Sequence, residues 1–162
     1  MPALVFPLSR IEGHARVVIH IEGGEVRSAS FQAMEFRGFK QLVHGVPAEQ
    51  MTVIVPRICG VCSTAHHIAA VKALEDAYGV EPPPLARRLR ELLLLGQLIQ
   101  SHATSLFIFT MPDRLGVSSI LDPGREKELD EQARIARWAL AVRTAGTHLI
   151  TTAGGQFIHP VK

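Results

Sequence analysis

The chain has few cysteines and no concentration of charge of either sign. Only two cysteines are present, whereas a short secreted domain that depends on disulfides usually carries several at wider spacings. Seventeen basic and fifteen acidic residues are spread along the chain without a basic block or interleaved aromatics, which argues against nucleic-acid binding. The cysteine pair is therefore more typical of a metal site or a redox-active dithiol.

A secretory signal and an uninterrupted apolar span are also absent from the sequence pattern. Met1–Arg10 contain no long apolar core followed by a small-residue cleavage site, so we expect a cytoplasmic location. The most apolar stretch, Leu92–Met111, is interrupted by polar residues such as Gln97, Gln100 and His102. Because such groups are costly in lipid, the pattern favours a buried helix and predicts no membrane span.

The length and the N-terminal pattern predict one unit that begins with β-structure. The 162 residues, 47% of them apolar, suffice for one compact core, and we expect a single unit over residues 1–162. A β-hairpin is predicted over Ala15–Phe31, because the Gly23-Gly24 pair permits a tight turn between β-branched runs. A further short strand is predicted over Met51–Val55, since Pro56 cannot donate a ladder hydrogen bond and would end it.

The rest of the chain has the apolar periodicity of helices. Three helices are predicted, over about Thr64–Tyr78, Leu85–Phe109 and Arg125–Ile150. Ser63 or Thr64 would cap the first of them, and Asp122-Pro123-Gly124 would form a turn before the last. Together these patterns predict a mostly helical α+β fold, with the N-terminal hairpin packed on a bundle of long helices.

The two cysteines lie where a strand would lead into the first predicted helix. Cys59 and Cys62 are separated by Gly60-Val61, a spacing that lets both sulfurs reach one metal ion, and the glycine permits the tight turn. Helix-terminal N–H groups and the nearby Arg57 would favour the thiolate over the thiol, which makes both sulfurs better ligands.

A single Cys-x-x-Cys motif leaves several kinds of site open. A thioredoxin-like dithiol suits the order of strand, motif and helix, but no strands alternate with the later helices to build the expected sheet. A closed structural zinc site needs four ligands, and only His66 or His67 is near. The remaining interpretations are another kind of metal site or a chance occurrence of the motif.

Two segments of the chain resemble the N-terminal motifs of [NiFe] hydrogenase large subunits. The first is Leu8–His14, with the sequence LSRIEGH, and the second is Arg57–Cys62, RICGVC, with His66 after it. They occur in the family's order and at a similar interval. The likeness extends over about Leu8–Val161, and its later landmarks are Ser101-His102, Pro112-Asp113, Gly154-Gly155 and His159-Pro160.

This resemblance implies roles for particular residues. Cys59 would be a terminal ligand of nickel, and Cys62 would bridge nickel to an iron that carries carbonyl and cyanide ligands. Glu12 would pass protons between a cysteine thiolate and the interior, while Arg57 and His66 would support the site from beside it. Heterolytic cleavage of hydrogen requires a metal, a basic thiolate that takes the proton and a carboxyl group that carries the proton away.

The chain also lacks parts that the family has. The remaining nickel ligands of the family come from a second Cys-x-x-Cys, which this chain does not contain, so it offers half of the ligands. We therefore expect a truncated or split gene, with a missing C-terminal half as a partner. Electrons would leave through iron–sulfur clusters in a separate small subunit. Magnesium is doubtful, because Lys40 stands where the family commonly places a magnesium-binding glutamate.

Reversible oxidation of H2 is thus the function that the resemblance implies, once the complementary parts are present. One alternative is a thiol–disulfide oxidoreductase that uses Cys59 and Cys62. The other is a non-catalytic scaffold related to the quinone-site subunit of respiratory complex I, although a scaffold has no need of paired thiolates.

Overall fold

The computed structural model describes residues 3–121 and 129–160, without the side chains of residues 129 and 130. The chain divides into two compact units, Met1–Leu42 and Val43–Lys162, and each is described by itself. The single unit expected over residues 1–162 stays a prediction. The turn predicted at Asp122-Pro123-Gly124 lies outside the described residues.

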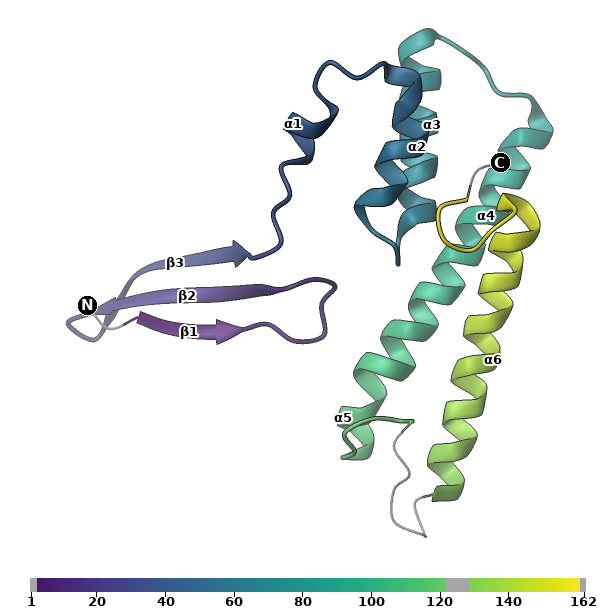
Figure 1. Cartoon of the computed structure of the whole chain (residues 1–162). Helices are drawn as coiled ribbons and strands as arrows, with labels where there is room; N and C mark the ends of the chain where they lie inside the picture. The colour runs from purple at the N-terminus through teal and green to yellow at the C-terminus, as the bar shows by residue number, and fades with distance from the viewer. Residues whose placement is uncertain (1–2, 122–128, 161–162) are drawn as a thin grey trace. The chain divides into compact units, whose positions relative to one another are not determined.

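The first unit contains a three-stranded antiparallel sheet in the order β1-β2-β3 (Figure 1). Its strands are β1 Ala3–Pro7, β2 Ala15–Glu22 and β3 Glu25–Ala33. The turn between β2 and β3 is made by Gly23 and Gly24, which have φ of +60° and +81°, values that glycine adopts without steric cost. The predicted hairpin is therefore confirmed.

Strand β1 was not predicted from the sequence. It pairs with β2, with Leu4 opposite Ile19, and all five of its residues are exposed. A strand that buries neither face shows no alternation of apolar and polar residues, so the period-2 signal is missing. Pro7 closes the strand at the sheet edge, where its lack of an N–H costs no ladder hydrogen bond.

The second unit is helical, and its long helices match the predicted ones. Helix α3, Ser63–Tyr78, ends at Gly79 in the left-handed conformation, and α4, Pro84–Ala103, begins at the last of three consecutive prolines. Helix α6, Leu129–Gly154, covers the described part of the third prediction. The shorter elements are α1 Phe39–Val43, η1 Ala48–Gln50, α2 Met51–Ile54, η2 Val55–Ile58, η3 Thr104–Thr110 and α5 Met111–Leu115.

Helices α4 and α6 run side by side, and glycine brings them close (Figure 1). A Cβ placed on Gly146 would lie 2.6 Å from the backbone nitrogen of Gln100 and 2.7 Å from the carbonyl oxygen of Gly96. Such an approach is possible only without a side chain at this position. The adjoining core contains Leu93 and Ile150, which are 1% and 0% exposed.

The long helix that starts at Pro84 changes its hydrogen-bond pattern before it ends. Its segment η3 is π-helical: the N–H of Met111 donates to the carbonyl of Leu106, and the Thr110 hydroxyl donates to that of Ser105. The backbone bond from Met111 to Leu106 spans five residues, as in a π-helix. The helix Pro84–Leu115 is long and apolar enough to span a membrane by length and composition, a test that core helices of soluble proteins also pass.

The strand predicted over Met51–Val55 is wrong. These residues form α2 and the start of η2, although Thr52, Val53 and Ile54 have β-branched side chains. Tertiary contact overrides their β propensity, because His67 on α3 forms a hydrogen bond of 3.0 Å through Nδ1 with the carbonyl oxygen of Thr52. The cysteines therefore follow a helical turn and not a strand.

Candidate metal site

The two cysteines lie on a tight turn between η2 and α3. Cys59 has extended backbone angles, φ −143° and ψ 123°, and Cys62 is the residue that caps α3. The backbone N–H of Cys62 donates a hydrogen bond to Sγ of Cys59 at 3.4 Å. Neither cysteine is in a disulfide, and both are half-buried. This hydrogen bond helps to fix the place of the Cys59 sulfur on the turn.

The first turn of α3 is held by buried polar residues. Ser63 and Thr64 are 1% and 0% exposed. The sequence predicted that one of them caps the helix, but neither forms a capping hydrogen bond with its side chain. The Ser63 hydroxyl instead accepts a hydrogen bond of 3.1 Å from the N–H of His159. This bond ties the residue after Cys62 to the segment that follows α6.

A second tie reaches the turn from α4. The side-chain amide of Gln97 donates to the carbonyl of Val61, between the cysteines, at 3.1 Å. Sequence reasoning gave no site role to Gln97, Ser63 or His159. The available signal was that Gln97 and Gln100 are polar residues in an otherwise apolar stretch, where a buried amide must find partners.

Arg57 and His66 flank the cysteines along the chain. The exposed guanidinium of Arg57 donates to the carbonyl of Val53, one turn earlier in the chain. His66 is half-buried, and its backbone N–H donates to the carbonyl of Cys62 at 3.3 Å. The structure thus brings both residues next to the cysteine turn, and their supporting roles stay predictions.

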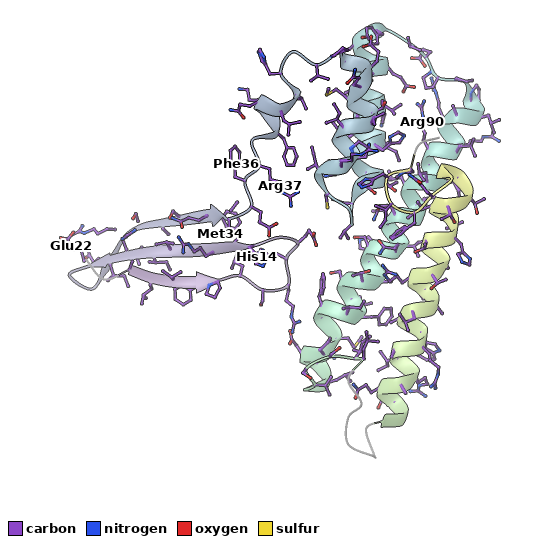
Figure 2. The ribbon with its side chains drawn as sticks, in the orientation of Figure 1. His14, Glu22, Met34, Phe36, Arg37 and Arg90 are labelled. Atoms are coloured by element: carbon purple, nitrogen blue, oxygen red, sulfur yellow. The ribbon has the colours of Figure 1, made fainter. Side chains whose placement is uncertain are left out.

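Glu12 lies in the first unit, on the exposed loop between β1 and β2. This loop contains Arg10 and Gly13, which have φ of +63° and +78°. Nδ1 of His14 lies 2.5 Å from a carboxylate oxygen of Glu35, and the His14 carbonyl accepts the N–H of Met34; both His14 and Met34 are labelled in Figure 2. These contacts fasten the loop to the end of β3, and the proton-transfer role of Glu12 stays a prediction.

The described residues offer the sulfurs of Cys59 and Cys62 at this turn. Within residues 3–121 and 129–160, no three His, Cys, Asp or Glu side chains are grouped so that they could hold a metal ion. His102 is exposed on α4. Two thiolates on one turn could form part of a site for a soft metal.

Family comparison defines the class of protein. A model of the nickel-dependent hydrogenase family matches residues 37–149, and a second model, described as HoxL-like, matches residues 5–36. The chain therefore belongs to the nickel-dependent hydrogenase family.

Individual relatives agree with this assignment. The chain is 41% identical over 162 residues to one subunit of the F420-non-reducing hydrogenase vhu of Methanocaldococcus jannaschii, covering 98% of this chain and 38% of the relative. It is 37% identical over 119 residues to the NAD-reducing hydrogenase HoxS subunit beta of Cupriavidus necator, covering 69% and 24%. The chain thus spans well under half of the curated relatives it matches.

Solved structures give the same result for the fold. An NAD+-reducing [NiFe]-hydrogenase in the H2-reduced state superposes with a TM-score of 0.81 at 36% identity, over 99% of this chain and 37% of that one. The Ni-Fe-Se hydrogenase from D. vulgaris Hildenborough gives a TM-score of 0.76 at 28% identity, over 96% and 34%. The mostly helical α+β fold is confirmed, and neither the dithiol oxidoreductase nor the scaffold is favoured by these matches.

Proposed function

We propose that this chain contributes Cys59 and Cys62 as two ligands of the nickel–iron centre of a hydrogenase that oxidises H2 reversibly. The observation that carries the proposal is the hydrogen bond from the Cys62 N–H to the Cys59 sulfur, in a chain that belongs to the nickel-dependent hydrogenase family. The chain's relatives named above are subunits of hydrogenases.

The chemistry of the donor set fits such a centre. Thiolates are soft ligands that suit nickel and low-valent iron, and a pair of them on one turn can share a metal or bridge two. The bound centre would supply the activation of H2. Cys59 would act as a terminal ligand and Cys62 as a bridging one, and a cysteine thiolate would take the proton.

Glu12 is the group that we propose to carry this proton away. Its carboxyl group is exposed in the first unit, on a loop fastened by the His14–Glu35 pair. A carboxyl group can accept and release a proton within one catalytic cycle when it lies within hydrogen-bond reach of the thiolate. Arg57 and His66 would support the thiolates from their places beside the turn.

The proposal includes two further components. The C-terminal half of the large subunit supplies the remaining ligands, because the described residues group two sulfurs and no third metal-binding side chain. An iron–sulfur small subunit takes the electrons, since the two cysteines of this chain are committed to the nickel–iron centre. The exposed Lys40 argues against magnesium at its position, because an ammonium group and a magnesium ion repel each other.

The test is co-expression of this chain with the complementary hydrogenase segments, followed by anaerobic purification. We expect nickel in the complex and H2-dependent reduction of a viologen dye. Cys59→Ser and Cys62→Ser should each abolish both. Val61→Ala is the matched control, because Val61 lies between the cysteines but contributes an exposed side chain without sulfur.

Retention of nickel and of H2 oxidation in both serine variants would contradict the proposal. A reversible dithiol couple in a complex without nickel would favour the oxidoreductase instead. Glu12→Gln separates the proton step from metal binding: it should keep the nickel and lose most of the dye reduction.

A further inference from the structure

The carbonyl of Val61 is the link between the cysteine turn and the long helices. Val61 lies between the two ligand residues, and its carbonyl oxygen accepts a hydrogen bond of 3.1 Å from Nε2 of Gln97. The two partners are 36 residues apart in the chain. The bond therefore couples the peptide between the sulfurs to a residue of another helix.

Gln97 is oriented by a chain of buried hydrogen bonds. Its side chain is 4% exposed, and Nε2 also donates to Oε1 of Gln100, which is 1% exposed, at 3.3 Å. Nε2 of Gln100 donates in turn to the hydroxyl of Thr104 at 3.3 Å. An amide nitrogen has two hydrogens, so Gln97 uses one for each partner and cannot rotate without losing one bond.

The backbone under Gln97 is equally constrained. The preceding residue, Gly96, lies at the crossing of α4 and α6, where a Cβ would come within 3.0 Å of the carbonyl oxygen of Gly146. Close-packed helices of this kind do not slide or rotate freely. Gln97 therefore presents its amide to Val61 from a fixed position.

We propose that Gln97 is a positioning residue for the two sulfurs. By donating to the Val61 carbonyl, it fixes the turn in the geometry in which Cys59 and Cys62 can bind the same atom. This inference rests on the proposed function in so far as that atom is a metal of the nickel–iron centre. Without the bond, the turn keeps its Cys62 N–H to Cys59 contact but loses its anchor on α4.

The experiment measures whether two sulfurs can close on one atom, without requiring nickel chemistry. Phenylarsine oxide forms two arsenic–sulfur bonds with a dithiol and releases water, so its affinity reports how well the pair is pre-organised. The full chain is reduced with a non-thiol phosphine and titrated with this reagent. We expect Gln97→Met to weaken the affinity about fivefold, the effect of one lost hydrogen bond.

Gln132→Met is the matched control. Gln132 is also buried, at 5% exposed, and its side-chain amide also donates to a backbone carbonyl, that of Ser119, at 2.9 Å. It lies apart from the cysteine turn in the sequence. This variant should lose comparable thermal stability and keep the arsenical affinity within about twofold.

Gln100→Met is a second variant that does not touch the cysteine turn. It removes the partner that orients the Gln97 amide, so it should weaken arsenical binding by less than Gln97→Met does. Wild-type affinity in both Gln97→Met and Gln100→Met would overturn the inference, as would an equal loss in Gln132→Met. Nickel in the co-expressed complex is measured separately: if that complex holds no nickel but the arsenical series holds, the proposed function fails and the positioning role of Gln97 stands.

Discussion

Because α4 and α6 cross closely at Gly146, we expect Gly146→Ala to lower the free energy of unfolding. The new Cβ would lie 2.6 Å from the Gln100 nitrogen, whereas ordinary contact begins at 3.4 Å, so the helices must separate by about 0.8 Å, the difference between these two distances. The obstructing atoms are backbone and cannot rotate away. Overpacking of this kind costs about 3 kcal/mol, and the better helix propensity of alanine returns about 1 kcal/mol. We therefore expect a net loss of about 2 kcal/mol in the free energy of unfolding.

Urea denaturation followed by far-ultraviolet circular dichroism measures this loss. Ala145→Gly calibrates the propensity term, because Ala145 is the exposed neighbour on the same helix and should lose about 1 kcal/mol by propensity alone. Both substitutions are thus expected to destabilise the chain. If Gly146→Ala instead raised the free energy of unfolding by about 1 kcal/mol, propensity alone would govern the site and the close crossing would be refuted.

Three further predictions concern single contacts. The pKa of Glu49 is lowered below 4.5 by a backbone hydrogen bond and by the Tyr78 hydroxyl, which lies 2.8 Å away. Tyr78→Phe removes the second of these bonds and should therefore raise the Glu49 pKa part of the way back. The stabilisation from this shift is present above pH 4.5 and is lost as pH falls through the lowered pKa; an unchanged Glu49 pKa in a carbon-13 NMR titration of Tyr78→Phe would refute the contact. Arg90→Met should cost about 1 kcal/mol in urea denaturation, because Arg90 (labelled in Figure 2) forms a half-buried ion pair with Glu75 at 2.6 Å. Arg87→Met, which breaks the exposed pair with Glu81, should cost about 0.3 kcal/mol, and equal costs would show that burial does not strengthen the first pair.

Local signals in the sequence were sufficient for the hairpin and the long helices. The Gly23-Gly24 turn and the 3.6-residue periodicity of α3 depend on neighbours in the chain, so pattern and propensity identify them. Strand β1 and the helical turn at Met51–Ile54 depend on distant partners. β1 exists because β2 pairs with it, and the Met51–Ile54 helix is held by His67 of α3, so neither could be inferred from its own residues.

The sequence pointed to the two cysteines of the candidate site, but not to the contacts that hold their turn in place. The Cys-Gly-Val-Cys spacing was compatible with a shared metal and with a redox-active dithiol, and the structure places both cysteines on one turn at the start of α3. The supporting contacts of Gln97 and Ser63 were not predictable, because they join segments 36 and 96 residues apart. The proton-transfer role of Glu12 stays a prediction.

The most direct test of the site is nickel X-ray absorption on the reduced chain loaded with one equivalent of Ni2+. Cys59 and Cys62 should both appear as sulfur neighbours of the same nickel, and each single serine variant should leave one sulfur. A nickel shell without sulfur, or one that keeps two sulfurs in either variant, would contradict the claim that these two residues hold one metal.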